Sequence, residues 1–231
     1  MNDNPPQQNV TMSERDGIAV VVIDDGKANA LSHLVLDQLD ECLDRAVEYP
    51  ALVIAGRPGR FSAGFDLSVM KQDGRCLGAD GEGAELALRL HEWPKPRCSR
   101  TGHALAMGAV LLGCADLRIG AMGEFKIGFN EVSIGLPMPE FASELHRGRL
   151  SPRHFHQAVA LARIYGPEDA VEAGFLDRMT EAEVVVDEAV ATAAELASRL
   201  SPPAFAITRA TLDRDLTVRL RDLTSGWADQ A

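Results

Sequence analysis

The sequence predicts an α/β fold, in which an α/β core is followed by a helical region. Short apolar runs typical of buried strands alternate with helical patterns early in the chain, and helical patterns dominate later. The 231 residues favour one domain, or one core with a helical appendage. Hydrophobic residues make up 46% of the chain and charged residues 25%, so a sizeable core is possible.

The first 60 residues contain a hairpin, a helix and a second strand. Residues 1–9 are polar and proline-bearing, which predicts a disordered tail. The stretch VTMSERDGIAVVVIDD predicts a β-hairpin whose turn is Asp16-Gly17 and whose second strand is a buried run from Ile18 to Ile23. Ser32 can cap the helix that follows, and Pro50 stops it. The apolar residues of that helix recur at Leu36, Leu39, Leu43 and Val47, and the run ALVIAG is a core strand.

Later segments are mostly helical. We expect helices over 84–93 and near 107–115, and strands over 116–121 and within EFKIGFNEVSIGLP. Helices that begin with a cap or an N1-like proline follow, and the stretch SPPAFAITRATLDRDLTVRLRDL closes the chain as one more. The core is expected to span 10–180 and the C-terminal helical region 181–231.

Composition and charge argue against nucleic-acid binding, membrane binding and a zinc site. The formal net charge of −11 disfavours binding to nucleic acid or to an anionic membrane surface, and an anionic ligand would need a local basic patch. The cysteines fit no zinc pattern and are expected to be reduced thiols in a cytoplasmic protein; they are Cys42, Cys76, Cys98 and Cys114. No segment reaches the roughly 20 apolar residues of a membrane span, and the N-terminus lacks the features of a signal peptide.

Five motifs in a fixed order carry a resemblance to a known family. They are DDGKANALS, GRFSAGFDL, GHALAMGAVLLGCADLRIG, FNEVSIGLP and GPEDAVEAGFLDRM, and the resemblance covers about positions 16 to 200. In this order and separation the chain resembles the crotonase superfamily, which includes the enoyl-CoA hydratases and isomerases. The resemblance implies a crotonase-like ββα spiral core and an acyl-CoA thioester substrate. It also implies no cofactor beyond the coenzyme A of that substrate, and C-terminal helices that form contacts in a homotrimer or hexamer.

Enolate chemistry explains the small residues of two of these motifs. Removal of a proton beside a thioester carbonyl places negative charge on its oxygen, and two backbone N–H donors aimed at that oxygen stabilise it. Such close approach of a backbone requires loops of small residues, and SAG at 62–64 and AMG at 106–108 are two such loops. The resemblance implies that the donors are the N–H groups of Ala63 and Met107. Ordinary tight turns are the structural alternative.

The carboxylates favour one reaction within the family. Hydratases of the family use two glutamates, and the resemblance places the first at Val110, which is neither acid nor base, and the second at Glu131. One carboxylate suits a double-bond shift, in which Glu131 takes a proton from C2 of a 3-enoyl-CoA and returns it at C4. The pattern is similar to that of the single-glutamate isomerases. Glu140 could supply a second acid, but a solvated helix start is its expected role.

Other residues are expected to bind the substrate. Lys27 is the best local cation for the phosphates of coenzyme A, followed by Lys71 and Arg60, and a solvated surface charge is the alternative for each. The resemblance adds contacts near the adenine, pantetheine or acyl group from Ala28, Ala30, Gly64, Gly108, Val110 and Leu136. Asp66 belongs to the same group, although it is expected to hold its own loop by accepting backbone N–H bonds.

Three further features carry little chemistry. His154 and His156 lie two residues apart and do not share a helix face, so no metal site is expected. His103 is expected to be a loop histidine. Neither a GxSxG elbow nor a P-loop is present.

One segment departs from the family pattern. Relatives carry a hydrophobic strand after Lys-Pro, whereas this chain reads KPRCSRTG and would bury Arg97 and Arg100. Unpaired guanidinium groups are very costly to bury. The sequence leaves three explanations open. The strand is shifted, the arginines find partners or routes to solvent, or the sequence is locally altered.

The leading hypothesis is a Δ3,Δ2-enoyl-CoA isomerase. A hydratase with a non-standard second acid and an acyl-CoA-binding relative without activity are the alternatives.

Overall fold

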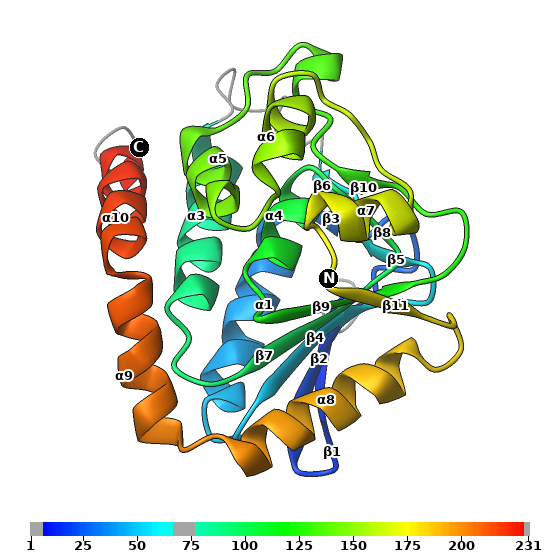
Figure 1. The fold of residues 1–231 in the computed structure, drawn as a ribbon, viewed down its shortest axis with the longest axis vertical. Helices are drawn as coiled ribbons and strands as arrows, with labels where there is room; N and C mark the ends of the chain where they lie inside the picture. The colour runs from blue at the N-terminus through cyan, green and yellow to red at the C-terminus, as the bar shows by residue number, and fades with distance from the viewer. Residues whose placement is uncertain (1–6, 67–76, 229–231) are drawn as a thin grey trace, which may run out of the picture.

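A six-stranded sheet forms the centre of the protein (Figure 1). The computed structural model describes residues 7–66 and 77–228. Strand order in the sheet is β1-β2-β4-β7-β9-β11; β1 runs antiparallel to β2, and each other neighbouring pair is parallel. These strands are β1 (Val10–Arg15), β2 (Ile18–Ile23), β4 (Leu52–Gly56), β7 (Arg97–Thr101), β9 (Leu117–Ala121) and β11 (Arg178–Thr180). The predicted α/β class is confirmed.

The predicted hairpin forms with the expected turn. Asp16 and Gly17 both adopt positive φ, 52° and 74°, which is the conformation that a tight two-residue turn requires. The expected disordered tail, 1–9, lies partly outside the described residues. Within them, the Gln38 side chain accepts bonds from the backbone N–H groups of Asn9 (2.8 Å) and Val10 (3.1 Å).

Helices cover both faces of the sheet. Figure 1 shows α1 (His33–Ala46), α3 (Leu77–His91) and α4 (Met107–Gly113) on one face of the sheet and α8 (Val185–Arg199) on the other. The buried side chains form one core cluster on each face. Alternation along β4 explains the two layers, because Leu52 and Ile54 join the first core cluster and Val53 the second. Ser32 caps α1 as predicted, with its Oγ accepting from the N–H of Val35.

Smaller elements lie at one end of the sheet. Three short strands form a second sheet in the order β10-β8-β5, and β3 pairs with β6. Their bounds are β3 (Ala30–Leu31), β5 (Arg60–Ser62), β6 (Gly64–Phe65), β8 (His103–Leu105) and β10 (Ile127–Gly128). A 3₁₀ helix (Val132–Ile134), α5 (Glu140–Arg147), α6 (Pro152–Val159) and α7 (Pro167–Ala173) follow.

The predicted closing helix is in fact two helices. α9 (Pro202–Leu212) ends at Asp213, and α10 (Arg214–Ala228) continues against α3 and α5. Neither glycine nor proline marks this break in the sequence, so helical periodicity could not reveal it. Among the described residues, none of these helices, nor any other, is long and apolar enough to cross a bilayer.

The arginines of β7 enter the sheet and find partners. Arg97 is 1% exposed, and its guanidinium contacts the carboxylate of Asp116 at 3.1 Å. Arg100 donates through Nη1 to the carbonyl oxygens of Gly56 (2.8 Å) and Arg57 (2.7 Å). The strand therefore keeps its place between β4 and β9, and of the three explanations the partners are the correct one.

A buried imidazole joins α5 to α4. His146 is fully buried, and its ring nitrogens lie 2.9 Å from the oxygen of Ala142 and 3.2 Å from that of Ala109. Gly113 makes room for this ring, because a Cβ there would overlap Nε2. Burial lowers the pKa of His146 to about 4, so the ring is neutral at neutral pH.

We expect Asp116→Asn to lower the free energy of unfolding by about 3–5 kcal/mol, because it leaves the Arg97 charge buried without its counterion. Urea denaturation measures the change. The control is Asp187→Asn, which removes an ion pair with Arg15 from a carboxylate that is 63% exposed. It should cost less than about 1 kcal/mol. Equal effects of the two variants would contradict the role of Asp116.

We expect the free energy of unfolding to fall as the pH is lowered from about 6.5 to about 4. Across this range the unfolded chain binds a proton at His146 and the folded protein does not, so acid favours unfolding by up to about 1.4 kcal/mol per pH unit for this group. His146→Gln should flatten the pH dependence in denaturation curves, and His156→Gln, at an exposed ring, should not. An unchanged slope in His146→Gln would refute the assignment.

Candidate active site

Three parallel strands bring the predicted site segments to one edge. In the small sheet, β10 and β5 both run parallel to the central strand β8. Parallel strands end on the same side of a sheet, where ligand sites commonly lie. The GRFSAGFDL loop leaves β5, the GHALAMG turn leaves β8, and Glu131 follows β10 by three residues. Segments separated by as many as 70 positions therefore start from one edge, at the upper right of Figure 1.

A buried asparagine holds the first loop in place. The side chain of Asn29 is fully buried, and its Nδ2 donates to the carbonyl oxygens of Ile23 (2.7 Å), Arg60 (3.1 Å) and Phe61 (3.1 Å). Its Oδ1 accepts from the N–H of Asp25 at 3.1 Å. One amide thus ties β2, the DDGKANALS loop and β5 together.

The same residue reaches the next loop through its backbone. Ser62 Oγ donates to the carbonyl oxygen of Asn29 at 2.7 Å, and it accepts from the N–H of Gly64 at 3.1 Å. Asn29 itself has φ of 54°, a conformation that asparagine tolerates better than most residues. The Ser62 hydroxyl therefore links the backbone of Asn29 to that of Gly64.

Ala63 is exposed, and its N–H is already engaged. It donates to the carbonyl oxygen of Ala28 at 3.1 Å. Asp66 N–H likewise donates to Leu31 at 3.1 Å, in the ladder that pairs β6 with β3. Because successive N–H groups in a regular ladder point to opposite sides, the N–H of Phe65, which precedes Asp66 in the ladder, points away from β3. Gly64, with φ of 90°, interrupts this alternation between Phe65 and Ala63. The sequence analysis did not consider the N–H of Phe65, because the pairing of β6 with β3, which distinguishes it from the N–H of Ala63, leaves no signal in the local sequence.

The two small-residue turns face each other. A Cβ on Gly64, whose φ is 90°, would lie 2.7 Å from Ala106 Cβ and 3.2 Å from Met107 N. Met107 is the first residue of α4, so its N–H belongs to the helix turn that has no intrahelical acceptor. Ala106 before it has φ of 50°, a strained value for alanine. The backbone of Met107 is thus presented directly to the GRFSAGFDL loop.

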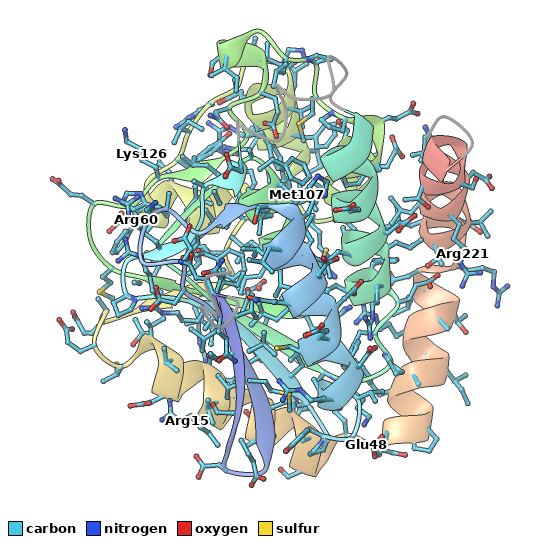
Figure 2. All side chains as sticks on the ribbon, turned by 180° about the vertical axis from the view of Figure 1, so that it is seen from behind. Arg15, Glu48, Arg60, Met107, Lys126 and Arg221 are labelled. Atoms are coloured by element: carbon cyan, nitrogen blue, oxygen red, sulfur yellow. The ribbon has the colours of Figure 1, made fainter. Side chains whose placement is uncertain are left out.

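The Met107 side chain does not block this approach. It is 2% exposed and lies between helices α1 and α3 in the view of Figure 2. A Cβ added to Gly83 of α3 would overlap the Phe65 ring and lie 3.4 Å from the Met107 methyl group. Both side chains therefore pack toward α3. Gly108 also needs its lack of a side chain, because a Cβ would lie 2.5 Å from Ser62 O.

Glu131 begins the 3₁₀ turn after β10. Its side chain is half-buried, and its Oε2 is shielded from solvent. Its carbonyl oxygen accepts from the N–H groups of Ile134 (3.1 Å) and Leu136 (3.0 Å), which fixes the turn. Leu136 is also half-buried. The carboxylate is therefore not directed wholly into bulk solvent.

The other acid candidate lies on the outside. Val110 is fully buried in the core, so the position of the family's other glutamate is apolar. Glu140 is 62% exposed and pairs with Arg219 of α10 at 3.0 Å. Its expected role as a solvated helix start agrees with this placement.

The candidate cations are scattered. Lys27 is exposed next to the half-buried Ala28, and Ala30 begins β3 beside Gly64. Arg60 starts β5, at the end opposite to the turn, and Figure 2 places it at the rim of the molecule. Lys71 lies outside the described residues. Asp66 is half-buried and follows β6.

No group of three or more histidine, cysteine, aspartate or glutamate residues in the described part of the chain could hold a metal ion. Cys42, Cys98 and Cys114 are free and buried, and burial raises the pKa of the Cys98 and Cys114 thiols to about 12. His103 accepts a bond at Nδ1 from the N–H of Lys126 at 3.0 Å. These groups serve the structure of the loops and the core.

We expect Asn29→Asp to lower the free energy of unfolding by at least about 3 kcal/mol. The substitution keeps the size of the side chain but removes the amide donor from the buried bonds to Ile23 O and Phe61 O and from the part-buried bond to Arg60 O. Each buried carbonyl group costs about 1–3 kcal/mol when unsatisfied. Chemical denaturation measures the loss. Ser133→Ala, which removes an exposed hydroxyl in a nearby turn, is the control and should change stability by less than about 0.5 kcal/mol. A tolerated Asn29→Asp would show that the amide is dispensable.

Comparison with known proteins agrees with the fold and the motifs. A family model described as enoyl-CoA hydratase/isomerase matches residues 13–226. A probable enoyl-CoA hydratase of Bacillus subtilis is 32% identical over 82% of this chain and 76% of its own length. The human mitochondrial enoyl-CoA delta isomerase 1 is 27% identical over 78% of this chain and 62% of its own length.

Solved structures show the same similarity. A structure described as the enoyl-CoA isomerase of Mtb has a TM-score of 0.91 at 38% identity, covering 96% of this chain and 99% of that one. An enoyl-CoA hydratase from Mycobacterium ulcerans has a TM-score of 0.91 at 36% identity, with the same coverage. On the match of the family model over most of its length, the chain belongs to the enoyl-CoA hydratase/isomerase family.

Proposed function

We propose that the protein is a Δ3,Δ2-enoyl-CoA isomerase that acts through a thioester enolate, with Glu131 as its acid and base. The observation that carries the proposal is the pairing of Glu131, after β10, with the apolar Val110 at the other acid position. A double-bond shift needs one group that carries a proton between two carbons. Water addition needs two groups that hold and activate a water molecule.

In this proposal the oxyanion donors are the N–H groups of Met107 and Phe65. Phe65 replaces Ala63 because the Ala63 N–H is bonded to Ala28 O. The close approach of Gly64 to Met107 N supports the pair, since it sets the two turns side by side. Donors fixed in advance at the carbonyl oxygen stabilise the enolate by several kcal/mol.

The proton transfers then follow in two steps. The Glu131 carboxylate takes a proton from C2 of the 3-enoyl thioester, and the electrons of that C–H bond move onto the carbonyl oxygen as a dienolate. The same carboxyl group returns the proton to C4, and a conjugated 2-enoyl thioester forms. The reaction consumes no water and requires no cofactor beyond the coenzyme A of the substrate.

The remaining parts of the site are proposals of the same kind. Lys27 is the cation proposed for the coenzyme A phosphates, and Ala28 and Ala30 are proposed to line the path of the ligand. The exposure of Lys27 beside the loop that Asn29 holds supports this placement. A homotrimer or hexamer in the cytoplasm is proposed from the family, and light scattering tests the mass.

We expect purified protein to convert a 3-enoyl-CoA to its conjugated 2-enoyl isomer, followed by ultraviolet absorbance. Glu131→Gln should lower kcat by about 10²–10⁴-fold, because the amide cannot carry the proton. Glu140→Gln, at an exposed carboxylate paired with Arg219, is the matched control and should retain activity. Unchanged turnover in Glu131→Gln would refute the assignment.

The same set of variants separates the alternatives. A hydratase would consume a 2-enoyl-CoA with loss of conjugated absorbance, and a role for Glu140 as second acid would make Glu140→Gln inactive in that assay. We retain this alternative because some relatives are named enoyl-CoA hydratases. Tight acyl-CoA binding without turnover of either substrate would identify a relative that has lost its chemistry.

A further inference from the structure

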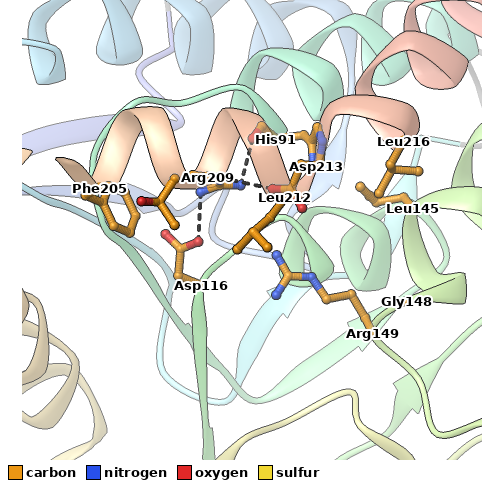
Figure 3. A pocket seen from close by; sticks show the side chains of 11 residues that line it. His91, Asp116, Leu145, Gly148, Arg149, Phe205, Arg209, Leu212, Asp213 and Leu216 are labelled. Atoms are coloured by element: carbon orange, nitrogen blue, oxygen red, sulfur yellow. Dashed lines mark hydrogen bonds and ion pairs between the residues drawn. The ribbon is translucent and has the colours of Figure 1, made fainter. Parts of the chain in front are cut away.

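A cavity lies away from the strand ends that carry Glu131. It is about 320 Å³ in volume and sits between the end of α5, the first residues beyond it, and the junction of α9 with α10. Figure 3 shows its lining, with Arg149 on one side and Arg209 and Leu212 on the other. None of the residues proposed for the isomerase reaction lines it.

Asp116, Arg209 and Asp213 of its lining form, with the buried Arg97 behind Asp116, an ion-pair network that is neutral as a whole. Asp116 accepts from Arg97 at 3.1 Å and from Arg209 at 2.7 Å, and Arg209 also contacts the carboxylate of Asp213 at 3.4 Å. Arg209 donates as well to the carbonyl oxygen of His91 at 2.7 Å. Two guanidinium groups and two carboxylates therefore balance, and burial holds the fifth titratable group, His91, neutral by lowering its pKa to about 4.

Arg149 supplies one positive charge beyond that balance. Its guanidinium makes neither a hydrogen bond nor an ion pair with any residue in 7–66 or 77–228, and no dashed line reaches it in Figure 3. Its backbone is fixed, because its N–H donates to His146 O at 3.0 Å. Asp177, a nearby carboxylate that feels its charge, is already paired with Arg118 at 2.8 Å. The cavity thus has an excess of one positive charge at Arg149.

The rest of the lining is mainly apolar. Phe205, Leu212 and Leu216 from the C-terminal helices face Leu145 of α5, and Thr208 adds one hydroxyl. Leu212 is 80% exposed, which is unusual for a leucine that lines a cavity. An occupant would need one negative charge for Arg149 and an apolar part for these side chains.

We propose that this cavity binds a small monocarboxylate with a short aliphatic chain. A carboxylate matches the planar fork of a guanidinium with two parallel hydrogen bonds. A dianion such as phosphate would bring excess negative charge near Asp116 and Asp213. The volume is at the lower end of the range for small-molecule sites, which fits a ligand of few carbons.

The site would link the body of the protein to its C-terminal helices. Arg149 and Leu145 belong to the body, whereas Thr208, Leu212 and Leu216 belong to α9 and α10. A ligand that contacts both parts of the folded protein and not the unfolded chain raises the midpoint of thermal unfolding. The inference is independent of the proposed isomerase reaction.

Hexanoate is the probe for the test, titrated into the 231-residue protein with labelled leucine methyl groups. We expect saturable shifts of the Leu145, Leu212 and Leu216 methyl signals and a rise in the melting temperature. Arg149→Met should raise the dissociation constant for hexanoate at least tenfold. Arg147→Met, at a 60% exposed arginine two positions away, should leave it unchanged. Hexanol, which lacks the charge, and inorganic phosphate should produce no saturable shifts.

Three results would overturn the proposal. The first is hexanoate binding that shifts other methyl groups only, or that Arg149→Met leaves unchanged. The second is phosphate binding as tight as that of hexanoate, which would mean that charge alone is recognised. The third is a wild-type protein that ignores hexanoate while Arg149→Met changes the assembly mass in light scattering, because a carboxylate of a second copy would then occupy the cavity.

Discussion

The buried amide of Asn29 is the interaction on which the candidate site depends. Its Nδ2 donates to carbonyl groups at the end of β2 and along β5, and the backbone carbonyl oxygen of the same residue accepts from the hydroxyl of Ser62. These bonds keep the DDGKANALS loop beside the GRFSAGFDL loop, and the second of these then meets the backbone of Met107. Backbone donors can act on a ligand only if the loops that carry them are fixed, and here a single side chain supplies much of that fixation.

In the central sheet, ion pairs and hydrogen bonds compensate for buried arginine side chains. β7 carries arginines where apolar residues would be expected, and their burial is compensated by Asp116 and by the carbonyl oxygens of residues 56 and 57. The Asp116 carboxylate also receives Arg209 from α9, so the same group supports the sheet and holds a C-terminal helix against it. The ion pairs of Asp116 thus connect β7, the start of β9 and α9, which are distant in sequence.

Local patterns predicted the parts of the structure that depend on neighbours in sequence. The Asp16-Gly17 turn, the helix after Ser32 and the run from Leu52 follow from turn chemistry, capping and periodicity. Arg97 could not be explained in this way, because its partner Asp116 lies 19 positions further on and Arg209 lies 93 positions beyond Asp116. The engagement of the Ala63 N–H with Ala28 O could not be read from the motif for a related reason, since only the pairing of β6 with β3 shows where each N–H points. Motif order placed Glu131 and Met107 in segments that leave one edge, but the family role of Glu131 is still a proposal.

The contact between Gly113 and His146 has a consequence for how related sequences can diverge. The imidazole of His146 occupies the volume that any side chain at Gly113 would need. A side chain at position 113 and a ring at position 146 therefore exclude each other sterically. A lineage that acquires alanine at position 113 must already have replaced His146 with a smaller residue. The order of the two changes is therefore restricted, and an alignment of descendants should show the pair varying together.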